Sequence, residues 1–304
     1  MTETRLKPDA AERSDAHLFD EAFLRALDRL VLVSKRVRAG QLQGERRSPK
    51  RGQSVEFADY RQYAIGDDFR QIDWNVYARL ERFFLKLFIE EEDLTVHLLV
   101  DSSASMDWGE PNKLDHARRL AGALGYIALA GLDRVTVSSF GAAAARFPAH
   151  RGKQAAYQMF AFLQDVQAEG GTNLAGNLRR YAQAARNPGP LLLISDLFDP
   201  GWQEGLRALL ARRFDVTVLH LLAPQEVAPD LAGDLRLRDA EGGVALEVTV
   251  DTALLQRYAD NLEAWQAELR HWCSARAISY VRTDTSLAPE ELVLTLLRRQ
   301  GVVH

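Results

Sequence analysis

The chain has 304 residues, of which 47% are hydrophobic, and a formal net charge of −4. This length and composition can bury a core without covalent help, and the single cysteine, Cys273, excludes an internal disulfide or a cysteine-based zinc cluster. The small negative charge gives no field that would gather nucleic acid or anionic lipid, which argues against nonspecific polyanion binding.

The beginning of the chain carries no targeting pattern. Residues 1–15 alternate charged and small residues and lack the apolar centre of a signal peptide. The most apolar helical stretch, 120–132, is too short for a bilayer core of about 30 Å. We therefore predict a flexible N-terminus over residues 1–16, no membrane span and a cytoplasmic location.

Residues 17–92 precede the regular part of the pattern. Apolar residues at near-helical spacing predict a helix over 17–38. The stretch 39–53 loses this periodicity and gathers basic residues around a proline, which we interpret as an exposed loop. A strand-like stretch over 83–92 then runs into a group of acidic residues.

From residue 93 onward, short apolar runs alternate with helical segments, which predicts a parallel sheet with right-handed crossovers. The predicted strands are 94–100, 134–140, 191–195, 216–222 and 278–282. The predicted helices are 114–132, 154–166, 173–186, 201–213, 252–275 and 289–300. Prolines and glycines interrupt the rhythm over 223–250, where we predict an inserted β-hairpin.

Oxygen-bearing side chains gather where three of these elements meet loops. Asp101, Ser103 and Ser105 follow the first apolar strand, Thr172 precedes a helix, and Asp196 follows another strand. Ligands collect at the carboxyl ends of such strands, and hard oxygen donors suit Mg²⁺ or Mn²⁺. We therefore predict a metal site formed by these five residues, with room for a carboxylate from a partner.

Each residue taken alone also fits a structural explanation. Asp101 and Ser105 could cap helices, Thr172 could cap the helix that follows it, and Asp196 could cap the helix after Pro200. The joint placement at one edge of a sheet favours the metal site.

Two sets of motifs resemble known families. Asp101-x-Ser103-x-Ser105, Thr172 within Gly-Gly-Thr-Asn and Asp196 within Ile-Ser-Asp resemble the metal-ion-dependent adhesion site (MIDAS) of von Willebrand factor type A domains. Upstream, residues 56–61 (EFADYR) and 66–74 (GDDFRQIDW) resemble the signature of the bacterial family called domain of unknown function 58. The similarity extends in order over about residues 20–300.

The resemblance implies an α/β fold. A von Willebrand factor A-like, doubly wound and mostly parallel sheet is flanked by helices and carries an N-terminal α+β extension and an inserted hairpin. The implied division is a segment 17–92 packed on the core and a von Willebrand A-like domain 93–304 with its insert at about 223–250. The usual third loop has glycine after its acidic residue, whereas Asp196 precedes Leu197, so Asp199 competes as the third-loop ligand.

The signature at 66–74 allows two interpretations. Its aspartates could form a second acidic site or a partner surface. Alternatively, Asp67 or Asp68 caps a short helix, arginines pair with the aspartates to lock the segment to the core, and Trp74 and Tyr77 are packing anchors. We favour the second interpretation.

The sequence contains no phosphate-binding loop and none of the common hydrolase motifs, so we predict no catalytic residues. The family resemblance implies association with a MoxR-type AAA+ ATPase. We therefore expect a metal-dependent interaction module that works as an adaptor in the assembly or maturation of a client and binds a protein partner through that partner's acidic residue. The alternative is a metal-dependent hydrolase, with the metal held by Asp101 and Asp196 and a general base at Asp107, Asp199 or His116.

Overall fold

The structure is a computed structural model that describes residues 19–21, 23–25, 27–28, 56–64, 67, 69, 72–89, 95–141, 144–242 and 245–293. The predicted basic loop at 39–53 and the N-terminal residues 1–16 lie outside these residues. The chain divides into two compact units, one comprising Met1–Gln41 with Leu94–His304 and the other Leu42–Asp93.

The larger unit contains a sheet in the order β10–β7–β6–β3–β4–β5, in which, among the described strands, only β5 is antiparallel to its neighbour. Its strands are β3 (Thr95–Asp101), β4 (Arg134–Phe140), β5 (Arg146–Arg151), β6 (Pro190–Ser195), β7 (Asp215–Leu222) and β10 (Ser279–Asp284). The chain winds outward from β3 in one direction and from β6 in the other, so the topological switch point lies between these two strands. This order confirms the prediction of a doubly wound, mostly parallel sheet.

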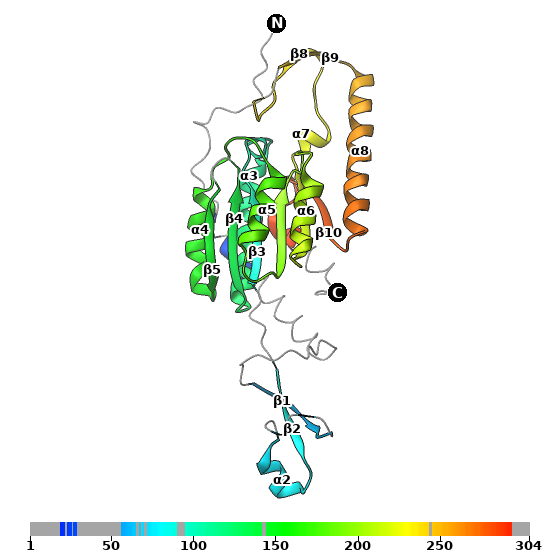
Figure 1. Ribbon diagram of the computed structural model, residues 1–304. Helices are drawn as coiled ribbons and strands as arrows, with labels where there is room; N and C mark the ends of the chain where they lie inside the picture. The colour runs from blue at the N-terminus through cyan, green and yellow to red at the C-terminus, as the bar shows by residue number, and fades with distance from the viewer. Residues whose placement is uncertain are drawn as a thin grey trace. The chain divides into compact units, whose positions relative to one another are not determined.

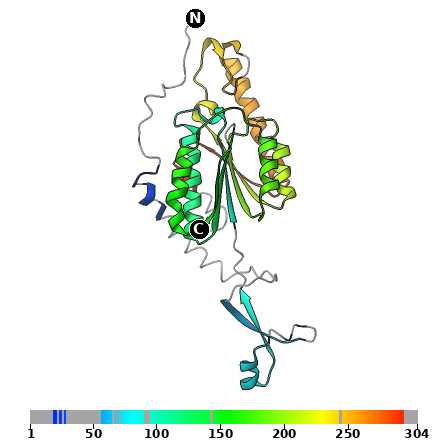
Figure 2. The same cartoon turned by 60° about the vertical axis from the view of Figure 1, so that its left-hand side comes forward.

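Helices cover both faces of this sheet (Figures 1 and 2). They are α3 (Lys113–Ala130), α4 (Ala156–Asp165), α5 (Leu174–Ala184), α6 (Trp202–Ala211) and α8 (Thr252–Ser274), with short 3₁₀ helices η3 (Ala104–Met106) and η4 (Lys153–Ala155). Leu98 packs with α3 and α4 in one core, whereas its neighbour Leu99 packs with α5, α6 and α8 in the other. Successive residues of a strand point to opposite faces, so β3 contributes to both cores.

The first predicted helix is described in part, at helical residues between 21 and 28. Phe23 and Leu27 are buried in the core formed with α3 and α4, and the ring of Phe19 stacks on Phe160 at 4.5 Å between centroids. The last predicted helix is described from Pro289 to Val293. No helix in the described part of the chain is long and apolar enough to cross a membrane.

The predicted insert is confirmed as a hairpin of β8 (Gly233–Leu237) and β9 (Leu246–Val250), preceded by the short helix α7 (Pro224–Val227). The strands pair antiparallel, with Leu235 opposite Val248. Most described side chains of the two strands are exposed. The hairpin is therefore held by few buried contacts.

The smaller unit is the predicted α+β extension and contains β1 (Glu56–Gln62), α2 (Trp74–Leu80) and β2 (Phe84–Ile89). The two strands form an antiparallel pair. The side chain of Asp73 caps α2 by accepting the backbone N–H groups of Asn75 and Val76, and its other oxygen accepts the hydroxyl of Tyr60 at 2.9 Å.

Asp67 does not cap α2, since Asp73 directly precedes this helix and its carboxylate accepts the N–H groups of the first turn. Asp67 instead accepts the N–H of Ala64 and pairs with Arg61 at 2.7 Å, while Asp68 lies outside the described residues. Within this unit the rings of Trp74 and Tyr77 both contact Phe83, at 6.3 and 4.4 Å between centroids.

Candidate functional site

Two buried carboxylates meet at the switch point of the sheet. Asp101 is the last residue of β3, Asp196 directly follows β6, and these strands are paired up to Val100 and Ile194. The two aspartates are 0% and 1% exposed. Burial, together with the neighbouring Asp196 carboxylate, raises the pKa of Asp101 above its usual range. The protein thus concentrates negative charge at a place where a cation would relieve it.

The first loop turns alternate side chains to one point. Asp101 Oδ1 accepts the N–H of Ser103 at 3.0 Å, and the hydroxyls of Ser103 and Ser105 are 2.9 Å apart. The hydroxyl of Ser195, which the sequence analysis did not single out, donates to Asp101 Oδ2 at 2.6 Å. Three of the five predicted ligands are therefore neighbours.

The second loop lies beside the first. The N–H of Ala104 donates to the carbonyl of Gly170 at 2.8 Å, and Gly170 has a φ of +69°, which glycine adopts without strain. Thr172, two residues further on, is buried, but its hydroxyl donates to Glu241 Oε1 at 2.6 Å. The structure therefore places Thr172 on the loop next to Ser103, in contact with a residue of the insert.

The third loop has an unusual backbone at Leu197, with a φ of +57°. This left-handed conformation is costly for leucine and natural for glycine, the residue usual at this position of the adhesion site. The N–H of Leu197 donates to the hydroxyl of Ser195, and its side chain is buried. The backbone conformation typical of glycine is thus present without the glycine.

Asp196 and Asp199 differ in what their carboxylates contact. Asp199 uses both oxygens on backbone N–H groups, those of Leu174 at 3.1 Å and Gly201 at 2.5 Å, and so ties the third loop to the start of α5. Asp196 accepts the N–H of Phe198 on Oδ1 at 3.3 Å and the ammonium of Lys113 on Oδ2, and it is the carboxylate whose charge acts on Asp101. This arrangement favours Asp196 over Asp199 as a ligand.

The helix-cap explanation of the predicted ligands is wrong. The side chains of Asn112 and Asn173 cap α3 and α5, and Gly201 occupies the cap position of α6. The short helix η3 has no side-chain cap bond. Helix capping therefore does not explain the positions of Asp101, Ser105, Thr172 and Asp196.

A buried lysine, Lys113, contacts the carboxylate of Asp196. The ammonium of Lys113 donates to Asp196 Oδ2 at 2.7 Å and to Glu226 Oε1 at 2.6 Å, and the residue is 0% exposed. Burial disfavours its charge, but the two carboxylates outweigh burial and raise the pKa of Lys113. Sequence reasoning missed this residue because a lysine in the first turn of a helix normally faces solvent.

A signal for Glu226 was present in the sequence. It lies three residues after Ala223, with Pro224 at the first helical position, which is a pattern of helix starts. Its Oε2 accepts the N–H of Ala223 at 2.7 Å, and the pattern explains this contact. The contact of its other oxygen with Lys113 has no sequence signal.

The donor set fits a hard divalent cation. Its oxygens belong to carboxylates and hydroxyls, and Mg²⁺ needs few protein ligands because it keeps several waters. Lys113 contacts Asp196 and Glu226 and offsets one of their two negative charges, and Asp101 adds a third carboxylate beside Asp196. No group of three His, Cys, Asp or Glu suited to a metal occurs among the described residues, so a metal here would depend on the hydroxyls.

The bases suggested for a hydrolase have other roles in the described structure. Asp199 is held by two backbone N–H groups, and Asp107 accepts the side-chain amide of Asn112 at 3.1 Å. Burial is the main cause that lowers the pKa of His116 to about 4. No observation favours the hydrolase alternative.

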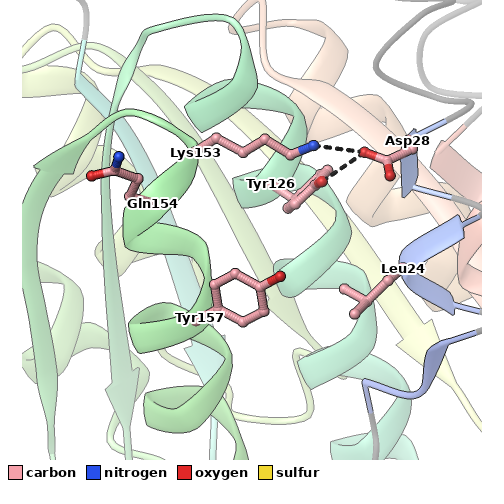
Figure 3. A pocket seen from close by; sticks show the side chains of 6 residues that line it. All are labelled: Leu24, Asp28, Tyr126, Lys153, Gln154 and Tyr157. Atoms are coloured by element: carbon pink, nitrogen blue, oxygen red, sulfur yellow. Dashed lines mark hydrogen bonds and ion pairs between the residues drawn. The ribbon is translucent and has the colours of Figure 1, made fainter.

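A cavity of about 300 Å³ lies elsewhere in the larger unit. Its lining residues are Leu24, Asp28, Tyr126, Lys153, Gln154 and Tyr157 (Figure 3). The carboxylate of Asp28 accepts both the ammonium of Lys153 and the hydroxyl of Tyr126. Asp28, Tyr126 and Lys153 thus satisfy one another, and the cavity includes none of the predicted ligands.

Comparisons with known proteins agree with the motifs. The family model described as "Protein of unknown function DUF58" matches residues 59–268. The uncharacterized protein Rv1480 of Mycobacterium tuberculosis is 32% identical over 319 residues, which cover 100% of this chain and 99% of that protein.

Solved structures with similar folds are more distant. The conserved hypothetical protein BatB from Bacteroides thetaiotaomicron is 17% identical, with a TM-score of 0.43, over 68% of this chain and 98% of its own. The vWF domain of the pilus tip protein Mfa5 from Porphyromonas gingivalis is 12% identical, with a TM-score of 0.31, over 69% and 96%. The fold assignment therefore rests on the strand order of this chain.

Proposed function

Since the chain belongs to the DUF58 family, and since its sheet ends in a buried cluster of oxygen donors, we propose that it is a metal-dependent protein-interaction module. Asp101, Ser103, Ser105, Thr172 and Asp196 hold Mg²⁺ or Mn²⁺. The bound cation takes a carboxylate from a partner protein as a further ligand. The observation that carries the proposal is the pair of buried aspartates at the switch point.

The chemistry of the cluster suits binding. Neutral hydroxyls and two carboxylates fill only part of the coordination of Mg²⁺, which keeps several waters, so a partner's carboxylate can replace a water as a further ligand. By the family resemblance, we further propose that the module is a cytoplasmic adaptor of a MoxR-type AAA+ ATPase and serves the assembly or maturation of a client protein. The ATPase would supply the nucleotide-driven work.

Metal binding is tested by calorimetric titration with Mn²⁺. We expect one bound ion in the wild-type chain and loss of at least tenfold in affinity in Asp101→Asn and Asp196→Asn. Asp215→Asn is the control, because it removes the same charge from an exposed position at the start of β7 and should bind Mn²⁺ as the wild type does. Equal binding by Asp101→Asn and the wild type would refute the site.

The adaptor role is tested with the purified MoxR-type ATPase of the same organism. We expect binding that requires Mg²⁺ and is lost both in chelator and in Asp101→Ala. Affinity unchanged by either treatment would show that the site does not mediate the interaction. Circular dichroism of each variant checks that the fold is retained.

A further inference from the structure

The turn of the inserted hairpin places an acidic side chain on Thr172, one of the proposed metal ligands. Glu241 lies between β8 and β9, and its N–H donates to Asp239 Oδ1 at 2.9 Å, which fixes the turn. Its carboxylate accepts two hydrogen bonds from Thr172, from the hydroxyl at 2.6 Å and from the N–H at 3.1 Å. The contact joins residues 69 positions apart in the sequence.

This carboxylate contacts the same hydroxyl that the proposed site assigns to the cation. Neighbouring oxygens around an octahedral Mg²⁺ with bonds of 2.0–2.1 Å lie about 2.9 Å apart. The separation of Glu241 Oε1 and Thr172 Oγ, 2.6 Å, is close to this value. A Cβ added at Gly171 would lie 3.4 Å from Glu241 Oε2, so the loop admits the carboxylate closely.

We propose that Glu241 is an internal ligand that occupies the position intended for the partner's carboxylate, so that a partner must displace the hairpin turn in order to bind. This inference depends on the metal site proposed above. The partner then presents an aspartate or glutamate on a projecting turn or loop, as the hairpin itself does.

The hairpin is built to be displaced. Four of the five residues of β8 and three of the five of β9 are exposed, with Val250 buried at its base. Little apolar surface is therefore lost when the turn leaves Thr172. Figure 1 shows the hairpin at the end of the larger unit where α7 lies, connected to the N-terminal end of α8.

The test uses Mn²⁺ as the probe and the relaxation of water protons as the readout. Glu241→Gln should bind Mn²⁺ about tenfold more weakly than the wild-type chain, because one charged ligand is lost. The relaxation enhancement per bound Mn²⁺ should rise, since a water replaces the carboxylate. Acetate should reverse that rise in the variant and leave the wild type unchanged.

Glu247→Gln is the matched control, since it removes the same charge from an exposed position of β9 and should behave as the wild type. Identical Mn²⁺ affinity and relaxation in Glu241→Gln and the wild type would overturn the inference and leave the metal site standing. Absence of Mn²⁺ binding in the wild type, or its persistence in Asp101→Asn, would instead refute the proposed function.

Discussion

Replacement of Lys113 by methionine tests whether the buried ammonium holds the cluster together. The side chain is fully buried and contacts Asp196 and Glu226 at 2.7 and 2.6 Å. Methionine has a similar length and no charge. In Lys113→Met, the apolar stem is replaced, and two carboxylates lose their shared cation.

The expected loss of stability is large. Removal of one partner from a buried ion pair typically costs about 3–5 kcal/mol, because the remaining charge is left without compensation. Lys153→Met is the control, since the Lys153 and Asp28 side chains are each 57% exposed and an exposed pair contributes less than about 1 kcal/mol. We therefore expect Lys113→Met to be destabilised several times more than Lys153→Met.

The assay is urea unfolding of both variants and the wild type, followed by tryptophan fluorescence. A second arm adds Glu226→Gln to Lys113→Met. The double variant should recover part of the loss, because it removes one of the uncompensated carboxylates. Equal losses in Lys113→Met and Lys153→Met, or a double variant less stable than Lys113→Met, would refute this account of the cluster.

Three further predictions concern stability. Burial, the main cause, lowers the pKa of His97 from 6.5 to about 4, so in this pH range the unfolded chain binds a proton that the folded chain does not, and stability falls as pH falls. His97→Gln should reduce this slope by about 1.4 kcal/mol per pH unit in urea titrations between pH 4.5 and 6, and an unchanged slope would contradict the assignment. Gly205→Ala should cost about 1–3 kcal/mol in urea unfolding, because the added Cβ would lie 2.8 Å from Leu178 Cδ1, and a more stable variant would show that α5 and α6 can separate freely. Asp73→Ala should remove about 1 kcal/mol of capping from α2 and speed hydrogen exchange at the Asn75 amide, and exchange at the wild-type rate would count against the cap.

Hydrophobic patterning predicted most of the sheet because its parallel strands are buried on both faces. Strand β3, for example, has six buried residues among its seven and contains the apolar residues Val96, Leu98, Leu99 and Val100. Strand β5 was not predicted. It is an antiparallel edge strand with mostly exposed residues and a proline, Pro148, so it lacks both the apolar run and the expected composition.

In the candidate site, too, the sequence predicts the contacts that local spacing determines and not those that depend on tertiary packing. The grouping of Asp101, Ser103 and Ser105 follows from their spacing after a buried strand, which local sequence contains. Lys113 contacts Asp196 across 83 positions, and such a contact depends on how α3 lies against the sheet. Sequence patterns carry no information on that placement.

The insert reaches the site at two points, and this links its position to the charge of the cluster. Glu226, on α7 at its base, binds Lys113 and through it Asp196, while Glu241, at its turn, binds Thr172. Both contacts depend on charges that a bound cation would change. By thermodynamic linkage, a partner that displaces the turn must alter the affinity for the cation by the same factor by which the cation alters the affinity for the partner. The hairpin would therefore couple the affinity for the partner to the affinity for the metal ion.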